Sequence, residues 1–121
     1  MDKLITFAVP CYNSAAYMEH CVDTLLQGGS DIEIILVDDG STKDDTPAIC
    51  DRYQEQYPDI VRAIHQPNGG HGEGVNQGIR NARGIYYKVV DSDDWVDVPA
   101  LHKALDKLRH FVRDNKLVDM M

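Results

Sequence analysis

An apolar stretch that ends abruptly in acidic residues constrains most strongly what this chain can fold into. Residues 86–90 are largely apolar, and they are followed at once by Asp91, Asp93, Asp94 and Trp95. A short apolar run that stops at polar residues is typical of a buried strand in a parallel sheet. Open α/β sheets bind their ligands at the edge where such strands end. The stretch therefore predicts a ligand site at the carboxyl edge of a sheet.

Apolar runs alternate with helical patterns along the rest of the chain. Strands are predicted at four positions, with a fifth beginning near the end of the chain: residues 4–10, 32–37, 60–65, 86–90 and 117–121. Amphipathic patterns with cap residues lie between them and predict four helices. The third helix is expected to follow a glycine-rich turn, with Val75, Ile79 and Ala82 on its inward face. This order predicts an α/β fold, a mostly parallel sheet with helices on both faces.

Composition limits the classes of function. A chain of 121 residues forms one domain or part of one. Its 12 basic and 20 acidic residues give a net charge of −8, which argues against nucleic acid and anionic membrane surfaces as general partners. Cys11, Cys21 and Cys50 are not paired by spacing and are expected to be reduced core residues. No signal-peptide pattern or membrane-spanning run is seen, so the cytoplasm is the expected location.

Asp91 and Asp93 are spaced to act together on a cation. They are two residues apart, so both side chains can reach one ion from the turn that follows the strand. Mg²⁺ and Mn²⁺ are typically bound by one or two carboxylates together with phosphate oxygens. The pair therefore predicts a divalent cation that also holds a diphosphate. The alternative is an acidic turn that caps the next helix, which opens at Asp97 and Pro99.

Four short motifs carry a resemblance to a known family. They are Pro-Cys-Tyr-Asn at 10–13, Val-Asp-Asp-Gly-Ser-Thr at 37–42, Asn-Gly-Gly at 68–70 and Asp-Ser-Asp-Asp-Trp at 91–95. In this order, each at the end of a predicted strand, they resemble family 2 glycosyltransferases. The resemblance runs from about residue 4 to the end of the chain. It implies that residues 1–121 are one incomplete domain, the Rossmann-like nucleotide-binding half of the GT-A fold.

The resemblance implies a base-binding role for residues after the first two strands. Pro10 and Tyr12 would line the nucleotide base, usually uracil, and Asp39 would accept a hydrogen bond from its ring N–H. A tyrosine ring can stack on a base, and a carboxylate that only accepts hydrogen bonds suits the uracil N–H. Asp38 would contribute to the site or only brace the turn. The structural alternatives are a Tyr12 that packs on the next helix and two acids that shape the turn before Gly40.

The same resemblance assigns the diphosphate end of the donor. Asp91 would face the ribose or the metal and Asp93 the metal, while Asp94 and Trp95 would belong to the sugar pocket. The start of the next turn is the alternative for Asp94, and core packing is the alternative for Trp95. Further residues assigned to the donor nucleotide are Asn68, Gly70, His71 and Asn76. Residues 71–78 depart from the common family pattern, so no arginine is carried over to the phosphates there.

By resemblance, the full-length protein transfers a sugar from a nucleotide diphosphate sugar, a UDP-sugar above all, with inversion and with Mn²⁺ or Mg²⁺ bound. A glycan, a lipid and a protein stay open as the acceptor, and so does peripheral association of the full-length protein with a membrane. The family's acceptor site and catalytic base follow the fifth strand. This chain is therefore expected to bind the donor without turnover and to self-associate through the open edge of its fifth strand.

Two other classes of protein share parts of this pattern. Gly72, Gly74 and Gly78, followed by Asp91, approach the dinucleotide-binding fingerprint of an NAD-dependent oxidoreductase. That fingerprint should follow the first strand, whereas here it follows the third. A receiver-like signalling domain also places carboxylates and Mg²⁺ at the edge of five parallel strands. It needs an acidic pair after its first strand, where this chain has Pro-Cys-Tyr at 10–12.

Overall fold

The computed structural model describes residues 3–41, 44–67 and 71–119, with side chains described at 3–41, 44–67 and 76–113. Within these residues four strands form one parallel sheet in the order β3-β2-β1-β4. The strands are β1 (Lys3–Cys11), β2 (Ile32–Asp39), β3 (Val61–Gln66) and β4 (Gly84–Val89). The helices are α1 (Met18–Leu26), α2 (Thr46–Gln56), α3 (His71–Asn81) and α4 (Val98–Asp119). The predicted α/β class with a parallel sheet is confirmed.

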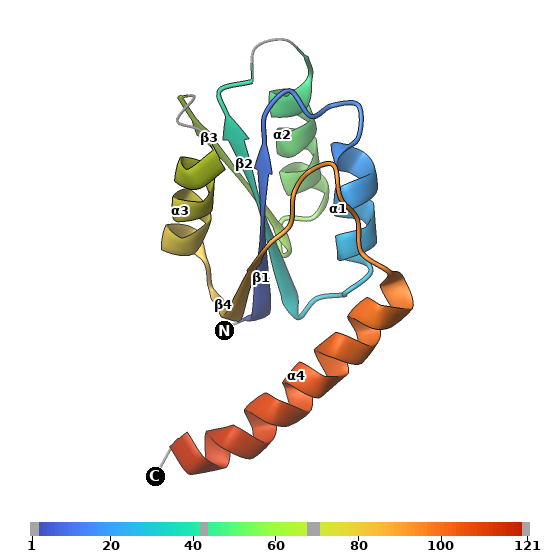
Figure 1. Ribbon diagram of the computed structural model, residues 1–121, viewed down its shortest axis with the longest axis vertical. Coiled ribbons are helices and arrows are strands. Elements are labelled where there is room, and N and C mark those ends of the chain that lie inside the picture. Colours follow the sequence, from blue (N-terminus) through green and yellow to red (C-terminus); the bar gives the residue numbers. More distant parts are fainter. Residues whose placement is uncertain (1–2, 42–43, 68–70, 120–121) are drawn as a thin grey trace.

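Helices cover both faces of the sheet (Figure 1). Helices α1 and α2 lie on one face, α3 lies on the other, and α4 runs below the amino edge of the sheet and away from the body. All four strands point the same way, so the loops that follow them gather at one edge, at the top of Figure 1. This edge is where an open α/β sheet binds its ligands.

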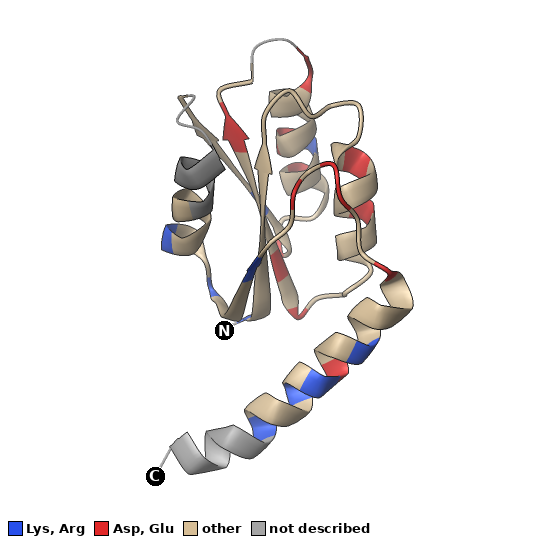
Figure 2. Cartoon of the chain, in the orientation of Figure 1, with Lys and Arg blue, Asp and Glu red and all other residues tan. Residues whose placement is uncertain are grey.

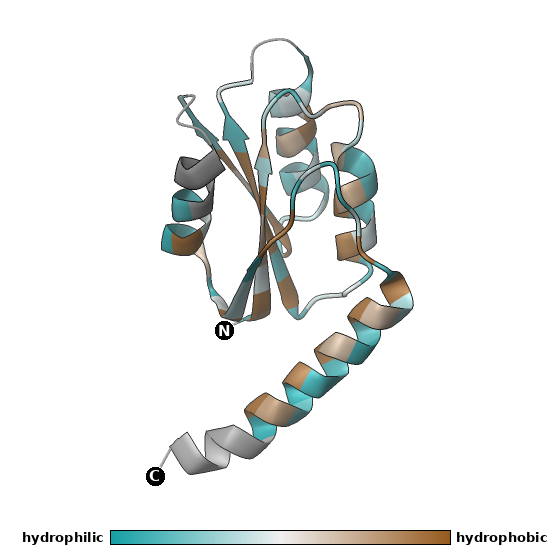
Figure 3. Ribbon diagram, viewed as in Figure 1, coloured by the Kyte–Doolittle hydropathy of each residue, from teal (hydrophilic) through white to brown (hydrophobic). Residues whose placement is uncertain are grey.

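The main core lies between the sheet and the pair α1 and α2. Alternate residues of the two central strands point into it, because side chains alternate between the faces of a strand. From β1 and β2 it contains Ile5, Phe7, Val9, Cys11, Ile32, Ile34 and Leu36. Figure 3 shows apolar residues along the strands and in α1, α2 and α4. The three cysteines are free and buried, as the sequence predicted.

The predicted fifth strand is wrong. The segment assigned to it, residues 117–121, falls in α4 as far as Asp119, and residues 120–121 lie outside the described part of the chain. The apolar residues of α4 recur at helical spacing, with Leu101 and Leu105 buried and Leu108 half-buried. Because of that spacing, the helix continues past the last buried residues. A strand at residues 117–121 would instead need the edge of another strand to pair its backbone groups. The expectation of self-association through a fifth-strand edge loses its basis.

The inward face of α3 also differs from the prediction. Ile79 is 55% exposed, Ala82 is half-buried, and the side chain of Val75 lies outside the described residues. The residue that meets the sheet is Gly78, where an added Cβ would lie 2.7 Å from the Cβ of Ala8. The glycine lets this helix approach Ala8 and Tyr87 of the sheet so closely that no side chain fits at position 78.

A buried carboxylate holds together the amino half of the sheet. Glu33, the second residue of β2, is fully buried and accepts hydrogen bonds from Thr6 Oγ1 at 2.9 Å and from the backbone N–H of Arg83 at 2.8 Å. Its other oxygen accepts from Arg83 Nε at 2.6 Å and lies 3.4 Å from a guanidinium nitrogen of Arg62. Burial raises the pKa of Glu33, but the hydrogen bonds from Arg83 and Thr6 outweigh it and hold the pKa below its ordinary value.

None of the helices in the described part of the chain is long and apolar enough to span a bilayer.

Candidate functional site

The carboxyl edge of the sheet brings together the ends of β1, β2 and β4. The strand ends are in register, with Cys11 beside Asp38 on β2, and Ala8 beside Val89 on β4. Acidic residues lie at the end of β2 and along the loop that follows β4, on either side of the central strand (Figure 2). We call residues 10–14, which begin at the end of β1, the base loop, and residues 91–94, which follow β4, the acidic turn.

The base loop carries an exposed tyrosine on a tightly held backbone. Tyr12 is 46% exposed, so about half of its surface is open to a ligand. Asn13 takes a positive φ of 49°, a conformation that asparagine tolerates better than most residues. The backbone N–H of Asn13 donates to Ser41 Oγ at 2.9 Å, and that of Tyr12 donates to Ser14 Oγ at 3.0 Å. The loop is therefore fixed from both sides, while Tyr12 stays partly exposed to solvent.

Asp38 braces the turn after β2, which is one of the two roles that the sequence analysis gave it. It is 4% exposed, and its Oδ1 accepts the backbone N–H of Ser41 at 3.0 Å. Its Oδ2 lies 2.8 Å from His65 Nδ1, and His65 Nε2 lies 2.7 Å from Asp51 Oδ1 on α2. Both oxygens of Asp38 are thus engaged with the protein itself.

Asp39 lies at the end of β2, one residue nearer the turn. It is 5% exposed, and its Oδ1 accepts a hydrogen bond from Gln66 Nε2 at 2.8 Å. The other polar atom of that amide, Gln66 Oε1, is buried and has no partner among the described residues. Gln66 pairs with Asp39 in the β2–β3 register, so this contact follows from the strand alignment. The sequence analysis missed Gln66, and only the register of β3 could have indicated it.

The acidic turn directs its carboxylates outward around one buried residue. The backbone N–H of Asp94 donates to the carbonyl of Asp91 at 2.9 Å, which closes the turn. Asp91, Asp93 and Asp94 are exposed, whereas Ser92 is buried. Burial of the Cys21 thiol and the nearby charges of these three acids raise its pKa to about 12. The three carboxylates therefore concentrate negative charge in one place.

This donor set suits a hard divalent cation that is held partly by its ligand. Exposed carboxylate oxygens are the ligands that Mg²⁺ and Mn²⁺ prefer. Among the described residues no three His, Cys, Asp or Glu side chains form a metal shell of their own. A cation at Asp91 and Asp93 would then complete its coordination with diphosphate oxygens or water, which is the usual arrangement for Mg²⁺. The residues present fit such a cation.

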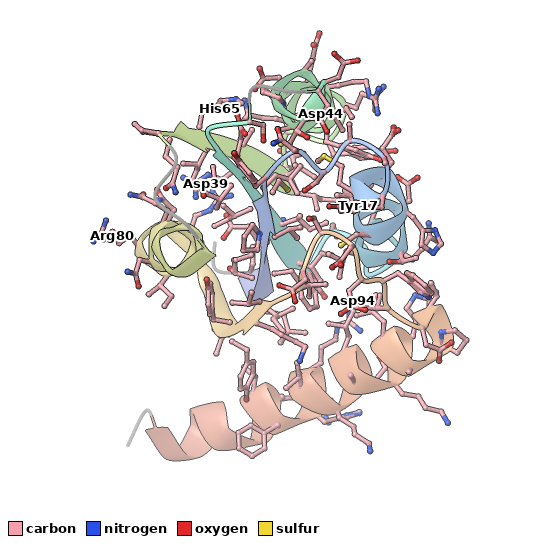
Figure 4. All side chains as sticks on the ribbon, turned by 45° about the horizontal axis from the view of Figure 1, so that its top comes forward. Tyr17, Asp39, Asp44, His65, Arg80 and Asp94 are labelled. Atoms are coloured by element: carbon pink, nitrogen blue, oxygen red, sulfur yellow. The ribbon has the colours of Figure 1, made fainter. Side chains whose placement is uncertain are left out.

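Trp95 lies beside the acidic turn and is not a core residue. It is 61% exposed, and its ring packs edge-on against that of His20 with 5.0 Å between the ring centroids. An exposed indole next to a carboxylate is an arrangement that can contact a sugar face, so the sugar-pocket role stays open for Trp95 and Asp94. Figure 4 shows Asp94 and Tyr17 on the side of the sheet away from Arg80, and Tyr17 is 43% exposed.

The glycine-rich segment contributes little that the structure describes. Asn68 and Gly70 lie outside the described residues, and so does the side chain of His71, although His71 is the first residue of α3. Asn76 is exposed on α3.

Pro10 pairs with Val37 in the β1–β2 ladder, directly before the base loop turns away from the sheet.

The main feature that the sequence analysis missed is a set of hydroxyl contacts between the loops. Ser14 donates its backbone N–H to Thr46 Oγ1 at 2.7 Å, and its Oγ lies 2.8 Å from Ser92 Oγ. Asp44 accepts the backbone N–H groups of Ala15 and Thr46 at 3.0 Å, and hydrogen bonding from Thr46 lowers the pKa of Asp44. Serine and threonine in loops are too common for sequence alone to show which of them meet.

The comparisons with known proteins agree with this geometry. Residues 6–115 match the family described as Glycosyl transferase family 2. The chain belongs to this family. Glycosyltransferase GlyG of Streptococcus pneumoniae serotype 4 is 48% identical over 98 residues, which are 79% of this chain and 32% of the relative. The chain spans about a third of the length of GlyG and about a tenth of the length of the chondroitin synthase of Pasteurella multocida.

Solved structures of similar fold hold nucleotide ligands. S. aureus TarS 1–349 in complex with UDP-GlcNAc superposes with a TM-score of 0.75 at 26% identity, over 93% of this chain and 32% of that one. The mannosyltransferase PcManGT from Pyrobaculum calidifontis, in complex with GDP-Man and Mn²⁺, gives 0.74 at 27% identity, over 87% and 32%. Family membership sets aside the oxidoreductase and receiver-like alternatives. The glycine-rich segment also opens α3, after β3, whereas a dinucleotide-binding fingerprint would follow the first strand.

Proposed function

We propose that this segment binds the donor of a glycosyltransferase, a nucleotide diphosphate sugar whose base is uracil. The observation that carries the proposal is that the ends of β2 and β4, with Asp39 and Asp91, flank the base loop at one edge of the sheet. This edge offers an exposed aromatic ring for a base, a carboxylate for a ring N–H, and outward acids for a cation on a diphosphate. UDP-GlcNAc in TarS and membership of family 2 support the same class of ligand.

Each part of the donor has a residue suited to it. Tyr12 would stack on the base, and Asp39 would accept the N–H of its ring, next to the amide of Gln66. Asp91 and Asp93 would hold a divalent cation, Mn²⁺ or Mg²⁺, which as a Lewis acid would stabilise the charge on the departing diphosphate. Trp95 and Asp94 would contact the sugar.

The reaction proposed for the full-length protein is transfer with inversion. An acceptor hydroxyl attacks the anomeric carbon on the side opposite the diphosphate, and a carboxylate base takes its proton. Positioned base catalysis contributes roughly 10²- to 10⁴-fold in rate. We propose that the base and the acceptor site belong to the longer protein, so that residues 1–121 bind the donor without turnover. The acceptor is not assigned, and action in the cytoplasm stays a prediction.

Calorimetry with four nucleotides tests the donor assignment. UDP, GDP, ADP and CDP are titrated into the 121-residue chain in the presence of Mn²⁺, with the variant Asp39→Asn measured alongside. UDP is expected to bind most tightly, and Asp39→Asn is expected to weaken UDP more than CDP, because cytosine lacks the ring N–H at that position. Equal binding of all four nucleotides would overturn base recognition. Tighter binding of GDP would favour a guanine donor, as in the PcManGT complex.

Stereochemistry tests the reaction. The longer protein is given an α-linked UDP-sugar, and the anomeric configuration of the first product is read by NMR. A β-linked product is expected, and an α-linked product would refute inversion. The same assay with residues 1–121 alone is expected to show no acceptor-dependent transfer.

A further inference from the structure

Two buried hydroxyl groups join the base loop to the acidic turn. Ser14 Oγ and Ser92 Oγ lie 2.8 Å apart, although the residues are 78 positions apart in the chain, and either atom can be the donor. Ser14 is 1% exposed and Ser92 is 8% exposed. A hydrogen bond between two buried hydroxyls is costly to break, because each group would lose its partner without gaining water.

Ser14 is fixed within the base loop by several hydrogen bonds to its neighbours. The backbone N–H of Tyr12 donates to Ser14 Oγ at 3.0 Å, and the backbone N–H of Ser14 donates to Thr46 Oγ1 at 2.7 Å. The carbonyl of Ser14 also accepts the N–H of Met18 at 2.9 Å, in the first turn of α1. Ser14 therefore moves with the loop that carries the exposed Tyr12 ring.

Ser92 is the inward anchor of the acidic turn. It is buried, whereas the residues on either side of it, Asp91 and Asp93, are exposed. A second inward contact comes from the Cys21 thiol, which lies 3.6 Å from the carbonyl of Asp91. Ser92 and the Cys21 contact therefore hold from inside the turn on which the two exposed carboxylates lie.

We propose that Ser14 and Ser92 form a positioning pair, which fixes the acidic turn relative to the base loop and so lets a divalent cation and a nucleoside diphosphate strengthen each other's binding. The inference rests on the proposed function. A ligand that contacts Tyr12 at its base and a cation at Asp93 spans the two segments, so its full affinity needs both at a fixed separation. The hydrogen bond supplies that separation before the ligand arrives.

The effect of losing the bond differs between the two halves of the site. Without Ser92 Oγ, the base loop keeps its contacts to Ser41 and Thr46, so the affinity for UDP alone is expected to change less than about twofold. The acidic turn loses its anchor, so a cation held there is no longer aligned with the diphosphate. The factor by which Mn²⁺ raises UDP affinity is expected to fall roughly 3- to 10-fold, the scale of one buried hydrogen bond.

Isothermal titration calorimetry measures this factor directly. UDP is titrated into the unchanged chain and into Ser14→Ala, Ser92→Ala and the double variant, each with Mn²⁺ and with chelator. Ser92→Thr keeps a hydroxyl and is expected to restore much of the factor. The matched control is Thr6→Ala, which removes a buried hydroxyl bonded to Glu33 at the amino end of β1 and is expected to lower stability without changing the factor. Thermal melts of all variants in chelator show which are folded.

The outcomes separate the inference from the proposed function. If Mn²⁺ fails to raise UDP affinity in the unchanged chain, the metal role itself is wrong and the pairing falls with it. If Mn²⁺ acts in the unchanged chain and equally in folded Ser14→Ala or Ser92→Ala, the positioning pair is refuted and the proposed function stands. A reduction in each single variant, with little further reduction in the double variant, supports the pair because both changes remove the same bond. Either single variant suffices if the other does not fold.

Discussion

His65 Nδ1 on β3 lies 2.8 Å from Asp38 Oδ2 at the end of β2, and this contact ties an edge strand to the turn beside the proposed base site. The other ring nitrogen, Nε2, lies 2.7 Å from Asp51 on α2, so one imidazole joins three elements. Hydrogen bonding to Asp38 and then to Asp51 raises the pKa of His65 above its ordinary value of 6.5.

The stability of the fold is expected to depend on pH through His65. Because its pKa is higher in the folded chain than in the unfolded chain, its contribution is fully present below pH 6.5 and is lost as the pH rises through the folded value. The side chain is 42% exposed, so the effect is expected to be only about 0.5–1 kcal/mol. Urea denaturation between pH 5.5 and about 8.5 should show this loss, and His65→Gln should flatten it. An unchanged pH profile in His65→Gln would contradict this role.

Replacing Glu33 by glutamine is expected to destabilise the fold strongly. The substitution removes a buried charge that faces two arginines and Thr6. The free energy of unfolding is expected to fall by about 2–3 kcal/mol. This loss lies below the range for fully buried ion pairs because the Arg83 side chain is half exposed. Asp31→Asn is the control, since Asp31 pairs with Arg109 in an exposed contact worth less than about 1 kcal/mol. Equal losses in the two variants, measured by denaturant unfolding, would show that Glu33 has no special role.

Gly78→Ala is expected to destabilise a helix that alanine would ordinarily favour. The new Cβ would lie 2.5 Å from Tyr87 Oη and 2.7 Å from Ala8 Cβ, so α3 must move away from the sheet. Overpacking of this kind costs about 1–3 kcal/mol, which exceeds the gain in helix propensity of about 1 kcal/mol. The loss should be smaller when Tyr87→Phe is also present, because one of the two clashes is then removed. Stabilisation by Gly78→Ala would show that the helix is not packed this closely.

Removing the Tyr12 ring is expected to weaken nucleotide binding. Stacking of an aromatic ring on a base is worth about 1–3 kcal/mol, so Tyr12→Ala should raise the Kd for UDP roughly 5- to 150-fold. Tyr57→Ala is the matched control, because Tyr57 is also exposed, at 40%. It follows the carboxyl end of α2, whereas the first residue of that helix, Thr46, contacts the base loop. If both variants bind UDP as the unchanged chain does, Tyr12 has no part in the base site.

Sequence predicted most of the fold because apolar runs and cap residues report on local structure. The sequence predicts that acids at the ends of the second and fourth strands share one edge, and the structure places Asp38, Asp39 and the acidic turn there. The prediction failed at residues 117–121, where a short apolar run fits a strand and the end of a long helix equally well. It failed again at Ile79, because Gly78 rather than an apolar side chain meets the sheet.

The contacts that organise the candidate site could not be predicted in the same way. Gln66 beside Asp39 depends on the register of β3, and Ser14 beside Ser92 depends on how two loops 78 residues apart meet. Glu33 reads in the sequence as a charge that interrupts an apolar strand, and only its three-dimensional partners explain why it is buried. Such pairings are fixed by tertiary structure and leave no local pattern.

The central claim is that the acidic turn holds a divalent cation on a nucleoside diphosphate, and the Mn²⁺ dependence of UDP affinity tests it most directly. Calorimetry would compare the unchanged chain with Asp93→Asn and with Asp59→Asn, which removes an exposed acid outside the acidic turn. The account predicts that Mn²⁺ raises UDP affinity by about 10-fold or more in the unchanged chain and in Asp59→Asn, and that Asp93→Asn abolishes most of this gain. UDP affinity that is the same with Mn²⁺ and with chelator, and the same in Asp93→Asn, would contradict it.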